Sequence, residues 1–115
     1  MRSGYNLARV RFEIILAPSA VTELRSLRAD IRSRVRDAIE LHLRYEPTKV
    51  SRSRIKLQGL EQPQYRLRVD EIRVFYDVLE ATVEVLAIVS KDQAQAWLDQ
   101  EATRTTSGGS GEGEG

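Results

Sequence analysis

The sequence contains no cysteine and only one histidine, His42, among its 115 residues. Without cysteine, neither a disulfide framework nor a thiolate metal site can form. No apolar run approaches the length that spans a membrane, and the polar first residues do not match a signal peptide. These absences favour a cytoplasmic protein. The length predicts one domain with a single modest core.

The net charge is also small, at +1, but the charges are unevenly distributed along the chain. Residues 1–68 carry 15 Lys and Arg against 7 Asp and Glu, a net charge of +8. Residues 69–115 carry 3 against 10, a net charge of −7. Such a split can mark a surface that binds a polyanion. Arginine dominates the basic part, and its guanidinium suits bidentate contacts to phosphate or carboxylate.

The stretch QYRLRVDEIRVFYDV, residues 64–78, organises the rest of the chain. Its alternation of β-branched and aromatic residues with charged residues predicts two half-buried strands. If Asp70-Glu71 is a two-residue turn, Arg68 faces Arg73 across the hairpin, and Arg66 lies on the same side. Opposed like charges are mildly destabilising. The opposed arginines therefore call for a compensating anion. This anion is either a phosphate or an acid of the chain itself, such as Glu71. The alternative is that the arginines form a solvated face.

The remaining elements follow from periodicity and from helix start and stop signals. They are a strand over residues 10–16, a helix from Pro18, a second helix from Ile31 to about Tyr45, a polar connection over 48–63, a central strand over 82–89 and a short helix that Ser90 caps. The order β-α-α-β-β-β-α predicts an α+β domain with an antiparallel meander sheet and a helical hairpin on one face. Residues 1–100 form the predicted domain, with a loose lead-in over 1–9. Residues 101–115 are predicted to be a disordered Gly/Ser/Glu tail or an added linker.

With this order of elements, the chain resembles the RelE/ParE superfamily of toxins from bacterial type II toxin–antitoxin modules. The resemblance covers about residues 10–98 and is carried by the segment IKLQGL at 55–60 and above all by YRLRVDEIRVFYDV at 65–78. In the RelE-like branch it implies a ribosome-dependent endoribonuclease that cuts mRNA and inhibits translation. Arg66, Arg68 and Arg73 match the basic sheet positions of the family, so the resemblance implies that they are the catalytic residues.

Cleavage of RNA by its own 2′-hydroxyl requires positive charge around the phosphorane, which arginines supply well. Guanidinium groups are poor general bases because they stay protonated. His42 lies on the apolar stripe of the second helix and is interpreted as a packing residue. No metal-ligand spacing is present, so a metal-independent enzyme without a cofactor is expected. Further contacts to the nucleic-acid backbone are predicted at Lys49, Arg52, Arg54, Lys56 and Lys91.

Two departures from the family keep other functions open. RNA-cleaving relatives often have an arginine after the last strand and a tyrosine in the final helix, whereas this chain has Lys91-Asp92 and Trp97-Leu98. The alternatives are a ParE-like inhibitor of DNA gyrase that is not an enzyme, or a module that retains only antitoxin binding. All three functions predict a hetero-oligomer with an acidic antitoxin, whose carboxylates would replace phosphate on the arginines. The endoribonuclease function also predicts binding to the ribosome and mRNA.

Overall fold

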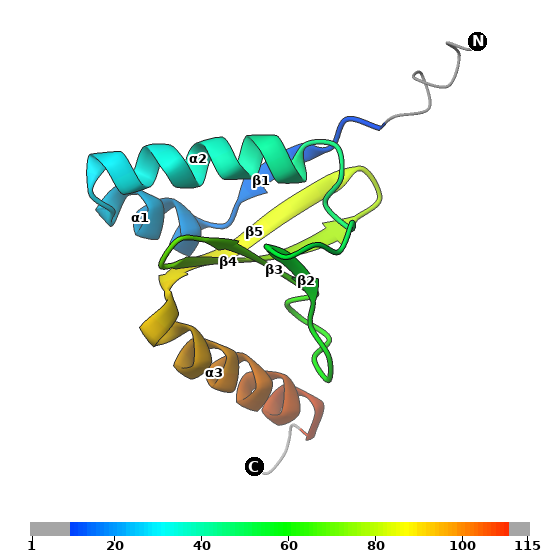
Figure 1. The fold of residues 1–115 in the computed structure, drawn as a ribbon. Helices are drawn as coiled ribbons and strands as arrows, with labels where there is room; N and C mark the ends of the chain where they lie inside the picture. The colour runs from blue at the N-terminus through cyan, green and yellow to red at the C-terminus, as the bar shows by residue number, and fades with distance from the viewer. Residues whose placement is uncertain (1–9, 111–115) are drawn as a thin grey trace, which may run out of the picture.

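The computed structural model describes residues 10–110, arranged as a five-stranded sheet with helices on both faces (Figure 1). The predicted α+β class is confirmed. The elements are β1 (Glu13–Leu16), α1 (Pro18–Ser26), α2 (Ala29–Leu43), β2 (Arg54–Lys56), β3 (Tyr65–Val69), β4 (Ile72–Leu79), β5 (Thr82–Ser90) and α3 (Lys91–Ser110). Helices α1 and α2 cover one face of the sheet, and α3 lies on the other (Figure 1). Within the described residues, none of the helices is both long and apolar enough to cross a membrane.

The strand order is β1-β5-β4-β3-β2; strands β3 to β5 form the predicted antiparallel meander, and β2 extends it by pairing with β3. β1 is added at the edge and pairs in parallel with β5, so the sheet is mixed rather than wholly antiparallel. A parallel neighbour requires a crossover connection, which α1 and α2 help to provide. β5 therefore has a partner on each side, as its apolar sequence predicts.

The central hairpin forms in the predicted register. Val69 pairs with Ile72, and Arg68 pairs with Arg73 across the turn. Asp70 adopts a positive φ of 54°, a conformation that aspartate tolerates better than most residues do. The two-residue turn thus forms without the glycine that such turns usually contain.

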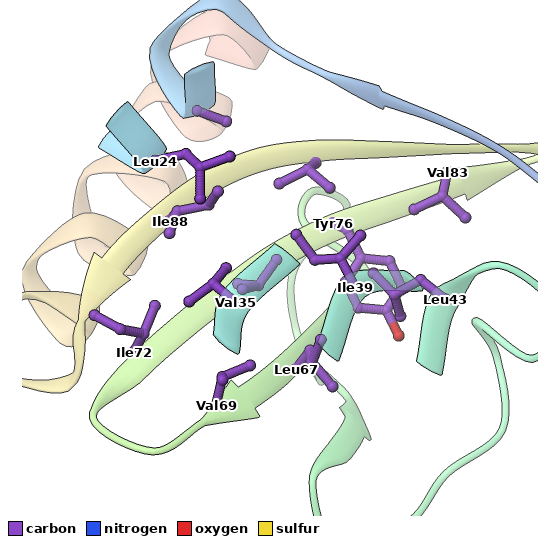
Figure 2. Close-up of a cluster of buried hydrophobic side chains, with 13 residues drawn as sticks. Leu24, Val35, Ile39, Leu43, Leu67, Val69, Ile72, Tyr76, Val83 and Ile88 are labelled. Atoms are coloured by element: carbon purple, nitrogen blue, oxygen red, sulfur yellow. The ribbon is translucent and has the colours of Figure 1, made fainter. Parts of the chain in front are cut away.

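The core lies between the hairpin of α1 and α2 and the sheet (Figure 2). Val35, Ile39 and Leu43 follow one another at helical spacing along α2 and are buried. They meet the inward side chains of β3, β4 and β5, namely Leu67, Val69, Ile72, Val74, Tyr76, Val83, Val85 and Ile88. The helical hairpin therefore packs on the apolar face of the meander, and the opposite face, which carries the arginines, points away from α1 and α2.

Several element boundaries differ from the prediction. β1 begins at Glu13 rather than at residue 10. The second helix is α2, which runs from Ala29 to Leu43, so Asp30 lies in its first turn, where its carboxylate pairs with Arg28. The segment predicted as a polar connection contains a short strand, β2, which the sequence signal missed.

Helix α3 continues to Ser110, past the predicted domain boundary at residue 100. Glu101, one residue beyond that boundary, is buried. The predicted lead-in over 1–9 and the last tail residues, 111–115, lie outside the described residues, so the division into domain and tail stays a prediction.

Candidate phosphate-binding face

The three predicted arginines occupy neighbouring positions on one face of β3 and β4. Cross-strand partners share a face of a sheet, and the register places Arg68 opposite Arg73 and Arg66 opposite Phe75. We call Arg66, Arg68 and Arg73 the arginine face. The predicted placement of these three residues on one face of the hairpin is confirmed.

No acid of the described chain neutralises this face by an ion pair. Arg73 uses its Nη1 to donate to the carbonyl oxygens of Asp70, at 2.8 Å, and Ile72, at 3.1 Å. Of the two turn carboxylates nearby, Asp70 pairs with Arg34 at 2.9 Å and Glu71 pairs with Lys91 at 3.2 Å. Both carboxylates of the turn therefore form ion pairs with other cations. The alternative in which Glu71 neutralises the arginines is not observed in this structure.

Arg66 is partly buried, and part of its guanidinium is removed from water. Its Nε is buried and has no hydrogen-bond partner within the described residues. Burial lowers the pKa of Arg66 below its usual value, and the positive charges of Arg73 and Arg68 lower it further. The group still stays protonated at neutral pH, because an arginine pKa lies far above that range. A buried donor without an acceptor costs free energy, and an anionic ligand would satisfy it.

A hollow of about 350 Å³ lies beside the arginine face, where α3 begins. We call it the arginine pocket. Its lining residues come from β3, β4 and the first two turns of α3, and they are Arg66, Arg73, Phe75, Lys91, Asp92, Ala94, Gln95 and Leu98. The backbone N–H of Lys91 donates to the carbonyl of Glu71 at 2.7 Å, which fixes the start of α3 against the β3–β4 turn. Positive charges and a helix N-terminus therefore meet at one hollow, as they do in many phosphate sites.

Aromatic packing holds α3 over the sheet. Trp97 stacks on the buried Phe75 with ring centroids 4.8 Å apart and an interplanar angle of 13°. The side of this helix formed by Ala94, Trp97 and Leu98 is partly buried. Trp97 is not among the residues that line the arginine pocket, so it does not take the place of the family's tyrosine there.

The predicted backbone-binding cations are not gathered at one place. Lys91 lines the arginine pocket. Lys56 pairs with Tyr65, so the register puts it on the face that carries the helical hairpin, opposite the arginine face. Lys49 is exposed and lies 3.9 Å from Glu46, and Arg52 is exposed in the connection between α2 and β2.

Arg54 corrects the sequence prediction most clearly. It is only 5% exposed, and its guanidinium donates to the carbonyl oxygens of Lys49, at 2.6 Å, and His42, at 2.8 Å. These bonds join the end of α2 and the following connection to β2. Arg54 is therefore a structural residue, and we do not carry it forward as a nucleic-acid contact.

The sequence analysis missed Asp92 and Gln95 as pocket residues. They are separated by three positions, a spacing that places both side chains on one side of a helix. Ser90-Lys91-Asp92-Gln93 was interpreted only as a helix start, and nothing in that pattern indicates which strand lies opposite. Within residues 10–110, no three histidine or acidic side chains gather as metal ligands would.

His42 lies on α2 and is partly buried, in agreement with its interpretation as a packing residue. Burial lowers its pKa below the usual 6.5, and the charge of Arg54 lowers it further. The folded protein therefore takes up this proton less readily than the unfolded chain does.

We expect this difference in pKa to make stability depend on pH. The free energy of unfolding should decrease as the pH falls below 6.5, where the unfolded chain becomes protonated at His42 and the folded protein does not. Urea unfolding at pH 7.5, 6.5 and 5.5 measures this dependence, and His42→Gln should reduce it. If the unfolding free energy of His42→Gln depended on pH in the same way as that of the wild type, groups other than His42 would be the cause.

Comparison with known proteins finds solved structures whose fold is similar to that of this chain. No protein-family model and no curated protein matches the sequence. The RelB–RelE antitoxin–toxin complex from Methanococcus jannaschii matches with a TM-score of 0.55 and 20% identity, over 72% of this chain and 96% of that one. The archaeal RelE–RelB complex from Pyrococcus horikoshii OT3 matches with a TM-score of 0.55 and 26% identity, over 71% and 97%. An arginine-to-alanine double mutant of E. coli toxin RelE in the free state matches with a TM-score of 0.51 and 17% identity, over 84% and 98%.

Proposed function

We propose, from the RelE-superfamily fold of this chain, that it is the toxin of a toxin–antitoxin module and acts as a metal-independent endoribonuclease on ribosome-bound mRNA. One observation carries the proposal. Arg66, Arg68 and Arg73 share a sheet face, and no carboxylate of the described residues forms an ion pair with them. Such a face is suited to binding a phosphate and stabilising its transition state.

The chemistry expected of this face is positioning and charge stabilisation. When a 2′-hydroxyl attacks the adjacent phosphorus, negative charge grows on the non-bridging oxygens. The exposed Arg68 and the partly buried Arg73 would orient the phosphate, and Arg66 would offer the unpaired Nε–H donor. A donor that is already oriented and partly desolvated stabilises developing charge more strongly than a solvated one.

The same face suggests how the toxin would be restrained. Carboxylates form bidentate bonds with arginine in the same way as phosphates do. We therefore propose that an acidic segment of a cognate antitoxin occupies the arginine face or the hairpin of α1 and α2. Two of the similar structures are complexes of RelE with RelB, which supports an antitoxin partner.

Two assays with purified protein test the proposal. The first follows cleavage of an mRNA on programmed ribosomes, and the second follows supercoiling by DNA gyrase. We expect the wild-type protein to cut the transcript and to leave supercoiling unchanged. Intact transcripts together with inhibited gyrase would instead support the ParE-like function.

The double variant Arg68→Ala/Arg73→Ala should cut the same transcript about 100-fold more slowly, because each of the two positive charges contributes about tenfold. Arg25→Ala/Arg36→Ala is the matched control, since both arginines are exposed and lie on the helical hairpin. Equal cleavage rates for the two double variants would show that Arg68 and Arg73 do not contribute to cleavage.

Gyrase inhibition remains the second candidate because of one feature of α3. The helix has Trp97, which packs on Phe75, and no tyrosine lines the described pocket, so that pocket has no aromatic hydroxyl for proton transfer. Inhibition by binding alone would not need such a group.

A further inference from the structure

Asp92 is the single carboxylate among the side chains that line the arginine pocket. It lies in the first turn of α3, and it has no hydrogen bond or ion pair with any residue of the described chain. Its neighbours differ in this respect, since Lys91 pairs with Glu71 and Gln95 donates to Asp99. The Asp92 carboxylate is therefore not committed to another group of the described chain.

The proposed reaction requires such an acceptor. Arginines hold their protons at neutral pH and cannot deprotonate a 2′-hydroxyl. The histidine of the chain, His42, belongs to α2, on the opposite side of the sheet from α3 (Figure 1). Of the residues that line the pocket with Arg66 and Arg73, Asp92 alone carries a carboxylate, a group that can act as a general base.

We propose that Asp92 is the general base of this enzyme and that the neighbouring Lys91 is the general acid; this inference rests on the proposed function. The Asp92 carboxylate takes the proton of the 2′-hydroxyl as that oxygen forms a bond to phosphorus. The bond from phosphorus to the 5′-oxygen breaks, and the leaving oxygen takes a proton from the Lys91 ammonium. The products are a 2′,3′-cyclic phosphate and a free 5′-hydroxyl, and solvent returns the proton from Asp92 to Lys91.

The charge around the pair is consistent with these roles. Arg66 and Arg73 face the pocket from β3 and β4, and Gln95 lies one turn further along α3. These arginines supply the positive charge that would hold a phosphate beside Asp92 and Lys91. Glu71, from the turn, keeps Lys91 at the edge of the pocket.

The experiment measures cleavage of mRNA on programmed ribosomes by the wild type, Asp92→Asn and Asp92→Glu. Each protein is assayed on a normal linkage and on a linkage whose leaving 5′-oxygen is replaced by sulfur. Sulfur leaves without a proton, so it restores activity when a general acid is lost but not when a general base is lost. Asp37→Asn, an exposed helical aspartate on α2, is the control, and thermal unfolding checks the fold of each variant.

We expect Asp92→Asn to be about 100-fold slower than the wild type on both linkages, and Asp92→Glu to recover part of the rate. Lys91→Ala should be slow on the normal linkage and restored on the sulfur linkage. Wild-type rates in Asp92→Asn would overturn the assignment while leaving the proposed function intact, and so would rescue of that variant by sulfur. A wild-type protein that leaves both transcripts whole would overturn the proposed function and this assignment together.

Discussion

Replacing Arg66 by methionine is expected to slow mRNA cleavage by a factor of about 10² to 10³ while the melting temperature stays the same or rises. Methionine keeps the length and the apolar stem of the side chain and removes the guanidinium. The loss of rate follows from removing a positioned, partly desolvated donor whose Nε has no partner within the described residues.

The effect on stability has the opposite sign because Arg66 is unfavourable in the free protein. Burial and the charges of Arg73 and Arg68 all lower its pKa, so the surroundings disfavour the charged form. Removing that charge relieves the repulsion and leaves no acceptor unpaired. A residue that costs stability and supports activity is typical of a functional site.

Thermal unfolding and single-turnover cleavage, measured on the same preparations, check this prediction. Arg36→Met is the control, because Arg36 is an exposed arginine on α2, away from the arginine face. Arg66→Lys separates charge from geometry, since lysine keeps the charge but lacks the Nε donor. A fall of several degrees in the melting temperature of Arg66→Met would instead make Arg66 a structural residue.

Arg54→Ala is expected to lower the free energy of unfolding by about 3 kcal/mol, a large share of the stability of a small domain. The variant would leave the carbonyl oxygens of Lys49 and His42 without their donor, in a site that is only 5% exposed. It would also remove the bonds that attach β2 to the end of α2.

Urea denaturation measures this loss, with the exposed Arg52→Ala as its neighbouring control. The control should change the unfolding free energy by less than about 0.5 kcal/mol. A loss below about 1 kcal/mol for Arg54→Ala would mean that water replaces the guanidinium at both carbonyls.

These two arginines indicate which parts of the site could be predicted from the sequence. The sheet face of Arg66 was predicted correctly because period-two alternation fixes the face of a strand residue once the turn at Asp70 is identified. Arg54 was assigned wrongly because β2 has only three residues, too few for the alternation to be recognised. The guanidinium of Arg54 then turns inward to backbone carbonyls that no sequence pattern indicates.

The order of the helices and of the meander strands could be predicted from hydrophobic periodicity and from helix and turn signals, which involve only a few neighbouring residues. The parallel pairing of β1 with β5 joins segments almost seventy residues apart, at Glu13 and Thr82, and no local signal marks it. The same limit applies to Asp92. Its position in a first helical turn was predictable, but its place beside Arg66 depends on how α3 crosses the sheet.

The proposed function depends on the Arg66 Nε–H, which has no partner within the described residues and is expected to bind an anion. NMR of the arginine Nε–H groups tests it, during titration with a dinucleotide whose 2′-hydroxyl is methylated to prevent cleavage. We predict that the Arg66 Nε–H resonance moves downfield on binding, while that of the buried Arg54, already bonded to a carbonyl, does not move. An Arg66 resonance that stays in place while the dinucleotide binds would contradict the account.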